Sequence, residues 1–297
     1  MKFWTVFFLL LGLARLPALT FEDGDTVVLL GNTVVERAQK YGHLETALTL
    51  ACGKAGVRFR NLGWSGDTVY GDARSYFGPP QEGFDRLKDN LAELKPQIVM
   101  ISYGAVASFE GEAGLDHFIK GYERLLEMIS TTASPREIVL ISPPPAESLG
   151  APLPDMGAHN RDLILYKEAI ATLAERRGLQ FADLFQSLLS EPKGNTDNGI
   201  HFTEQGYRVL SQALLGELGL PRPAPGQLES ESGQQLRQAI IAKNKLFFFQ
   251  WRPSNETYLR LFRKHEQGQN ARELAEFDPL IAAAEAKIES LRKSTLE

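Results

Sequence analysis

Thr33 carries a hydroxyl group at a point where a strand turns into a helix, a position from which a nucleophile can be presented. Residues 29–36 read LLGNTVVE, a short apolar strand followed by Gly-Asn-Thr and the start of a helix. The same residues fit a helix N-cap, with Asn32 or Thr33 as the cap and Glu36 completing a capping box. The pattern favours the cap, which explains these residues without catalysis, and leaves a nucleophilic Thr33 as the alternative.

Three other polar turns contain glycine and residues with reactive side chains. They read GWSGDTV (63–69), GAVASF (104–109) and TDNGIHFTEQGY (196–207). Ser65 is the nearest other hydroxyl, and His201 is the histidine best placed to line a site. Asp67 is expected to stabilise its loop by accepting backbone N–H groups. The isolated histidines on helical stretches are expected at the surface: His43, His117 and His265.

No metal or cofactor is predicted for this sequence. A metal site needs several histidine, cysteine or carboxylate ligands at a suitable spacing, and no histidine–carboxylate pair has that spacing on one element. The single cysteine, Cys52, excludes an intrachain disulfide and any site with several cysteines.

These turns need elements that bring them together, and residues 26–218 supply them. Apolar runs predict strands at 26–30, 57–62, 97–103, 137–142 and 179–184, and helical patterns lie at 34–53, 84–94, 114–130, 158–177 and 204–217. Strands that alternate with helices imply a five-stranded parallel sheet with helices on both faces, an α/β fold. Sites in such sheets form at the carboxyl ends of the strands, so the four polar turns are expected to share a cleft.

The composition is that of an ordinary globular protein. The chain has 297 residues, of which 43% are hydrophobic and 23% charged, and its formal net charge is -5. A net negative charge argues against a general nucleic-acid binder, because no basic excess exists to neutralise phosphates.

The first twenty residues have the layout of a secretory signal. Lys2 precedes an apolar run from Phe3 to Leu13, and a proline-containing region of small residues follows. The run is shorter than the ~20 residues that span a bilayer. We therefore expect cleavage near residue 20, an exported protein and no stable membrane insertion afterwards, with an uncleaved anchor as the alternative.

The organisation that follows has four parts. Residues 1–20 are the signal peptide, 21–219 the α/β domain, 220–232 a proline-rich linker, and 233–297 a helical C-terminal extension.

The order of the four turns resembles the SGNH hydrolases, also called GDSL lipases or esterases, over roughly residues 24–218. The resemblance implies a flavodoxin-like α/β/α sandwich that hydrolyses acyl esters, including carbohydrate O-acyl groups, without a cofactor. In that family a serine of the first turn is the nucleophile, and here GNT places Asn32 and Thr33 at its Asp-Ser pair. NLGWSGDTV resembles the second block, which implies that the backbone N–H of Gly66 is an oxyanion donor.

The third and fourth blocks depart from the family pattern. YGAVA places Val106 where the family has an asparagine that donates to the oxyanion, and a valine has no side-chain donor. The family's last block reads Asp-x-x-His, which implies that His201 is the general base; Asn198 stands three residues before it, and Asp197 one residue further. An Asp-to-Asn change at the equivalent place in serine proteases lowers the rate by about 10⁴.

The C-terminal extension resembles one found in a subgroup of exported SGNH-like proteins whose first block also lacks the serine. Residues 237–264 interleave arginines and lysines with aromatic residues. These residues fit either a binding surface for a protein or a glycan, or a helix whose aromatics dock on the α/β domain while the basic side chains stay in water. The pattern favours docking.

Three hypotheses for function remain. The first is a cleft that binds an acylated or carbohydrate ester with weak or no hydrolysis, because Thr33, Val106 and Asn198 replace the reacting groups. The second is a genuine esterase that uses Thr33, His201 and Asp197 with Gly66 as the oxyanion donor. The third is an interaction module that acts through residues 233–297.

Overall fold

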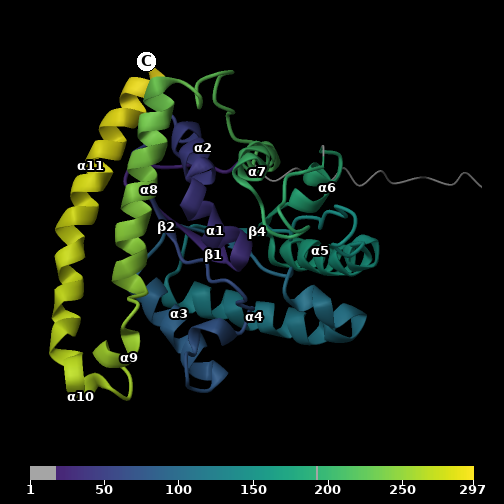
Figure 1. Cartoon of the computed structure of the whole chain (residues 1–297), viewed down its shortest axis with the longest axis horizontal. Coiled ribbons are helices and arrows are strands. Elements are labelled where there is room, and N and C mark those ends of the chain that lie inside the picture. The colour runs from purple at the N-terminus through teal and green to yellow at the C-terminus, as the bar shows by residue number, and fades with distance from the viewer. Residues whose placement is uncertain (1–17, 192) are drawn as a thin grey trace, which may run out of the picture.

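A parallel sheet of five strands forms the centre of the fold (Figure 1). The computed structural model describes residues 18–191 and 193–297; the predicted signal peptide falls mainly on residues 1–17, outside this part. The strand order is β2-β1-β3-β4-β5, and all neighbouring strands are parallel. The strands are β1 (Thr26–Gly31), β2 (Arg58–Asn61), β3 (Ile98–Ser102), β4 (Glu137–Ile141) and β5 (Gln180–Ala182). The five expected strands are confirmed, with ends within two residues of the prediction.

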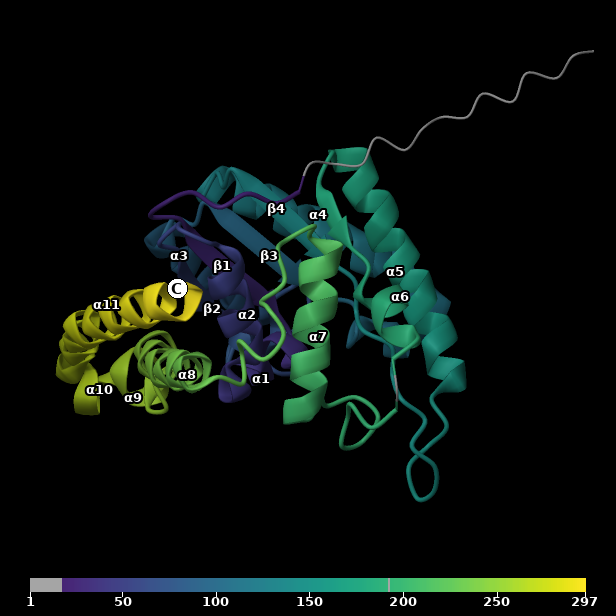
Figure 2. The same cartoon turned by 90° about the horizontal axis from the view of Figure 1, so that it is seen from above.

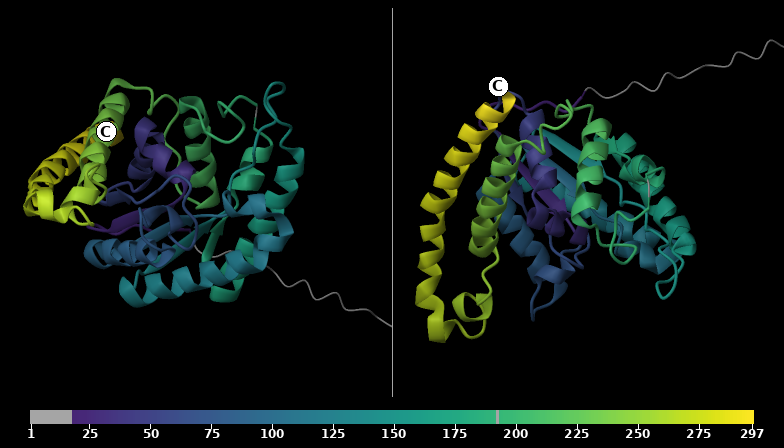
Figure 3. Two further views of the ribbon diagram at one scale, coloured as in Figure 1. Left: turned by 60° about the horizontal axis from the view of Figure 1, so that its bottom comes forward. Right: turned by 45° about the horizontal axis from the view of Figure 1, so that its top comes forward.

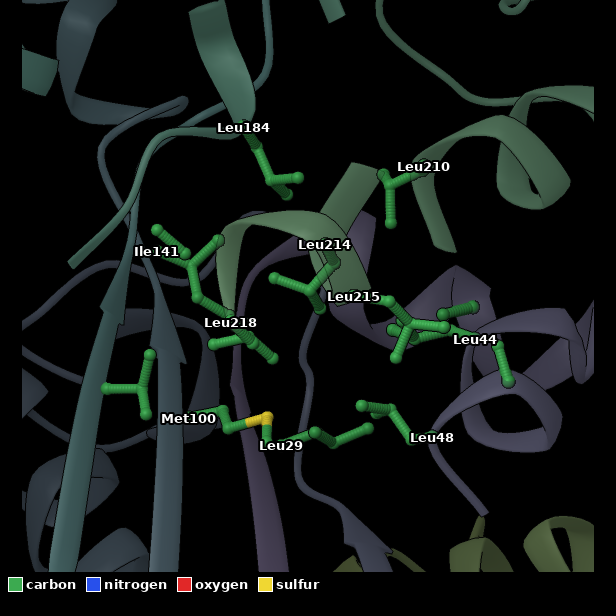
Figure 4. Close-up of a cluster of buried hydrophobic side chains, with 14 of the residues drawn as sticks. Leu29, Leu44, Leu48, Met100, Ile141, Leu184, Leu210, Leu214, Leu215 and Leu218 are labelled. Carbon is green, nitrogen blue, oxygen red and sulfur yellow. The ribbon is translucent and has the colours of Figure 1, made fainter. Parts of the chain in front are cut away.

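Helices cover both faces of the sheet, as the alternating pattern predicts. One face packs against α1 (Thr33–Tyr41), α2 (His43–Ala51), α6 (Leu184–Leu189) and α7 (Glu204–Glu217), and the other against α3 (Pro80–Leu94), α4 (Leu115–Thr132) and α5 (Gly157–Arg177). Figure 4 shows part of the first layer, where Leu29 and Met100 of the sheet meet leucines of α2 and α7. Because both faces are covered, the central strands read as unbroken apolar runs rather than alternating ones.

The single helix predicted for 34–53 is two helices, which is a correction. Gly42 separates α1 from α2 with a φ of 72°, a left-handed conformation that glycine adopts without strain. A Cβ at Gly42 would lie 2.8 Å from the side chain of Ile241, so α8 (Glu231–Trp251) also requires a glycine there. The short helix α6 was not predicted either.

The C-terminal extension forms a helical hairpin beside the edge strand β2. The helices α8 and α11 (Phe277–Leu296) lie against each other on the outer side of α1, α2 and β2 (Figures 1 and 2). Three short segments join them at the bottom of Figure 1: α9 (Glu256–Leu259), α10 (Lys264–Gln267) and the 3-10 helix η3 (Gly268–Glu276).

The docking of this hairpin is partly apolar and partly ionic. Phe247 is buried in the core, as the docking interpretation expects. Lys243 was expected to stay in water with the other basic side chains, and that expectation is wrong. Its ammonium group is 1% exposed, lies 2.6 Å from Glu45 Oε1 and donates to the carbonyl of Phe59 at 2.9 Å.

The topology sets where a site can form. The strand order changes direction at β1, so the crevice of this fold lies beyond the carboxyl ends of β1 and β3. The views in Figure 3 show the loops that leave the sheet on that side, with the end of α8 close to the loop that follows β2. Among the described helices, none is long and apolar enough to cross a membrane.

Candidate active site

Thr33 is the first residue of α1 and follows the end of β1 almost directly. Asn32 is the N-cap, since its side chain accepts the N–H of Val34 at 3.5 Å, which confirms one of the two cap candidates. The capping box is wrong, because the carboxylate of Glu36 accepts the backbone N–H of Ser65 instead. The Thr33 hydroxyl therefore does not cap the helix.

Gly66 brings a backbone N–H to this hydroxyl. The Gly66 nitrogen lies 3.4 Å from Thr33 Oγ1. The φ of Gly66 is +77°, and no atom lies within 4 Å of the place that a Cβ would take, so the residue borders open space. A hydroxyl and a backbone donor that face each other at such a place can flank a reacting carbonyl.

Asp67 holds the same loop from its buried side, in agreement with the structural role expected for it. Its carboxylate accepts the Nε–H of Arg74 at 2.7 Å, the hydroxyl of Tyr103 at 2.8 Å and the N–H of Ala73 at 3.3 Å. Burial alone would lower the pKa of Arg74, but the negative charge of Asp67 and its hydrogen bond raise this pKa above its ordinary value. Burial raises the pKa of Tyr103 well above its ordinary value, so Tyr103 is a neutral donor.

His201 lies on a tight loop between Thr196 and α7. Thr196 and Phe202 form a β-bridge, and the N–H of Asp197 donates to the carbonyl of His201 at 2.9 Å. Glu147, in the segment after β4, accepts the N–H groups of residues 194–196 at 2.8 to 3.1 Å. The loop is thus fixed by a carboxylate distant in sequence.

Asn198 contacts the imidazole of His201 through its amide nitrogen. Asn198 Oδ1 already accepts two backbone N–H groups, from His201 at 2.8 Å and Ile200 at 3.1 Å. These two bonds fix the amide orientation and leave Nδ2 at 3.2 Å from His201 Nδ1. An amide N–H can only donate, so neutral His201 must accept at Nδ1 and carry its proton at Nε2. A general base in a triad needs the opposite tautomer.

The carboxylate of Asp197 pairs with α1. Asp197 Oδ2 lies 3.6 Å from Arg37 Nη2, and half of the Asp197 side chain is exposed. In the part of the chain that the structure describes, the side chain that hydrogen-bonds the His201 ring is Asn198. The role of Asp197 as the orienting acid of a triad stays a prediction.

Val106 and Ser65 border the same edge of the sheet. Val106 is half-buried at the start of the 3-10 helix η2 (Ala107–Gly114), on the loop after β3. Ser65 is exposed next to Gly66. The structure therefore places Thr33, Ser65 and Gly66 together, with Val106 on the loop after the neighbouring strand.

Comparison with protein-family models now identifies this arrangement. The model of the GDSL-like Lipase/Acylhydrolase family matches residues 25–209, more than half of the chain. The chain belongs to this family. The match ends within α7, so the C-terminal extension lies outside it.

Solved structures of two hydrolases share the fold. The Axe2 acetylxylan esterase from Geobacillus stearothermophilus is 17% identical, with a TM-score of 0.53 over 68% of this chain and 98% of the esterase chain. LAE5, an alpha/beta hydrolase enzyme from the metagenome of Lake Arreo in Spain, is 19% identical, with a TM-score of 0.50 over 67% and 97%. No curated protein matches the chain. At this identity the likeness establishes the SGNH hydrolase fold and leaves the chemistry to the site itself.

Three residues of this GDSL-family site were missed by sequence reasoning. Arg37 pairs with Asp197, Glu147 holds the histidine loop, and Arg252 lies 3.2 Å from Glu36. Each acts on a partner far away in the chain, so no local pattern marks it. Basic and acidic residues of this kind are ordinarily read as solvated side chains.

Proposed function

We propose that this GDSL-family protein binds an acylated carbohydrate in the open space beside Thr33 and Gly66 and hydrolyses it weakly or not at all. The observation that carries the proposal is the amide of Asn198 at His201 Nδ1. Held in this way, neutral His201 carries a proton at Nε2 and has no free lone pair there with which to deprotonate a hydroxyl.

Two further departures act in the same direction. A threonine nucleophile brings a methyl group that restricts its rotamers and crowds the approach of a carbonyl. Val106 offers no side-chain donor, and the loss of one oxyanion donor costs ~2.7–4 kcal/mol of transition-state stabilisation. The backbone donor of Gly66 and the open space beside it need no catalysis to bind a carbonyl oxygen. The acetylxylan esterase named above supports an O-acetylated sugar as the ligand class.

The experiment is hydrolysis of p-nitrophenyl acetate by purified protein. We expect no turnover above background for the native chain and for Thr33→Ala, and measurable turnover for the triple variant Thr33→Ser, Val106→Asn, Asn198→Asp. Native turnover as fast as that of the triple variant, and lost in Thr33→Ala, would refute weak or absent catalysis.

The second candidate function is a genuine esterase that uses Thr33, His201 and Asp197. It is favoured by the 3.4 Å separation of the Thr33 hydroxyl from the Gly66 N–H and by the acid next to Asn198. In that case Asp197→Asn should also lower turnover strongly, although less than Thr33→Ala does. The third candidate, an interaction module, would use residues 233–297 to bind a protein or glycan.

We also propose that the protein is exported through residues 1–20. The basic, apolar and small-residue order of this segment supports the proposal. Fractionation of cells that express a tagged chain should find it outside the cytoplasm, and deletion of residues 1–20 should keep it inside. If the full chain and the chain without residues 1–20 were found in the same cell fractions, export through this segment would be contradicted.

A further inference from the structure

The end of α8 touches the loop that carries Gly66. The indole rings of Trp251 and Trp64 lie 5.7 Å apart at an angle of 68°. The guanidinium carbon of the next residue, Arg252, lies 3.5 Å from the centre of the Trp64 ring. Trp64 is 8% exposed and stands two residues before Gly66, so the extension covers the start of this loop.

Glu36 joins three segments through one carboxylate oxygen. Its Oε2 accepts the N–H of Ser65 and lies 3.2 Å from Arg252 Nη1. Glu36 is one turn along α1 from Thr33, and Ser65 directly precedes Gly66. Both side chains of the ion pair are about three-quarters buried, at 21% and 24% exposure, where charge pairs are less screened than on an open surface.

The orientation of the Gly66 N–H depends on how this loop is anchored on its two sides. On the far side, Asp67 is fixed by Arg74 and Tyr103, which belong to the α/β domain. On the near side, the Ser65 N–H is held by Glu36, whose charge is balanced by Arg252 of the extension. The C-terminal extension thus completes one of the two anchors.

We infer that Arg252 is a positioning residue that acts through Glu36 and Trp64 to hold the Gly66 N–H toward the Thr33 hydroxyl. The extension is then a part of the site rather than a separate module. This inference uses the proposed role of Gly66 as the donor to a ligand oxygen, but the placement of the loop can be measured without any ligand.

Hydrogen exchange of the full protein, followed by NMR, tests the placement. We expect Arg252→Gln to raise the exchange rates of the Ser65 and Gly66 amides at least tenfold. Arg252→Lys, which keeps a cation beside Glu36, should restore much of the protection. The matched control is Arg263→Gln, since Arg263 also lies in the extension but pairs with Glu266.

A double-mutant cycle separates positioning from general loosening. If Arg252 acts through Glu36, then Arg252→Gln should add little to the effect of Glu36→Gln on these amides. Unchanged exchange of Ser65 and Gly66 in Arg252→Gln, or an equal rise throughout α8 and α11, would overturn the inference. The exchange rates of Ser65 and Gly66 are measured without a ligand. If the protein failed to bind acylated sugars, the proposed function would be refuted, but the test of Arg252 would still stand.

A second, independent observation is a pair of exposed aromatic rings. Phe77 is 76% exposed on the segment after β2, and Phe262 is 67% exposed between α9 and α10. Their ring centres lie 5.7 Å apart with the planes at 81°. Tyr76 links this pair to the loop of Gly66, because its ring lies 5.6 Å from that of Trp64. Large exposed apolar groups that gather in this way mark a contact surface.

We propose that Phe77 and Phe262 bind a sugar ring of the same glycan chain whose ester lies in the open space beside Gly66. Two rings at a right angle present an apolar corner, and the C–H face of a pyranose packs on such rings. The continuity with the Gly66 loop favours a glycan over a second protein chain, and this step rests on the proposed function.

Affinity measurements with two ligands, acetylated xylohexaose and acetylated xylose, test this surface. Each ligand is titrated into the native protein and into the double variant Phe77→Ala, Phe262→Ala. We expect the hexasaccharide to bind the variant at least tenfold more weakly, with no change for the monosaccharide. Phe249→Ala, at an exposed aromatic on α8, is the control. Equal hexasaccharide affinity, or a change of oligomeric state instead, would refute the glycan surface. Absence of any sugar binding to the native protein would refute the proposed function as well.

Discussion

The tautomer of His201 gives the sharpest test of the candidate site. The Asn198 amide cannot flip without turning its NH₂ group toward two backbone N–H groups, from Ile200 and His201. A proton on His201 Nδ1 would therefore meet a second donor at 3.2 Å. The lost hydrogen bond costs about 1 kcal/mol, and a donor without an acceptor costs about 1–3 kcal/mol when buried. Because His201 is partly exposed, we expect a difference of about 1.5–2.5 kcal/mol, which is a preference of about 10- to 60-fold for the Nε2–H form.

The change that reverses this preference is Asn198→Asp. A carboxylate at this position accepts a hydrogen bond from Nδ1–H, so the ring should switch to the Nδ1–H form that leaves the Nε2 lone pair free. The ¹⁵N chemical shifts of the two ring nitrogens, measured well above pH 7, report which nitrogen is protonated.

The control is Asp197→Asn. Its carboxylate pairs with Arg37 in the structure, so this substitution should leave the tautomer of His201 unchanged. A native protein that already shows the Nδ1–H form would refute the reasoning. If Asp197→Asn converted His201 from the Nδ1–H form to the Nε2–H form, Asp197 would be the orienting acid, and this result would favour the genuine esterase.

Three further predictions concern stability. Asp67→Asn leaves the guanidinium of Arg74, whose side chain is 1% exposed, without a counter-charge. We expect the free energy of unfolding to fall by about 3–5 kcal/mol and the Tm by about 10 °C. The control, Asp89→Asn on the exposed side of α3, should change neither quantity. Lys243→Met should lower the free energy of unfolding in urea by a similar ~3–5 kcal/mol, because it leaves the buried carboxylate of Glu45 without its counter-charge. The double variant with Glu45→Leu should recover much of this loss. No recovery would contradict the pairing. Burial lowers the pKa of His43 below its usual 6.5, so the unfolded chain takes up a proton there before the folded chain does. Stability should therefore fall as the pH drops below about 6.5, and His43→Gln should flatten this dependence in thermal melts at pH 7 and pH 5; an equal slope in both proteins would contradict it.

The fold could be predicted from the sequence because its strands are buried on both faces. Such strands read as short apolar runs, and the run at β3 lies between two clear helical patterns. The break at Gly42 was missed since one glycine within an apolar helical pattern is common, and the reason for this break is the approach of α8. His43 was expected at the surface but is 4% exposed, for the same kind of reason: Glu204 and Arg208 of α7 cover it.

The site was predicted where the chemistry depends on backbone position and missed where it depends on distant partners. The turn after β1 and the glycine after β2 meet because the carboxyl ends of neighbouring parallel strands lie at one edge, which any sequence with this topology must obey. The contact between Glu36 and Arg252 could not be predicted from the topology, because 216 residues separate the two and no strand order brings them together.

Glu36 shows how a local signal can mislead at a candidate site. Its spacing from Thr33 fits a capping box, and the pattern therefore favoured a helix cap over a nucleophile. In the structure the carboxylate turns away from the helix end to the Ser65 N–H and the Arg252 guanidinium. That leaves the Thr33 hydroxyl free to meet Gly66, so the evidence for a cap at Thr33 disappears. Under the proposed function, the amide of Asn198 at His201 is the main limit on catalysis, and Asn198→Asp is the substitution to make first.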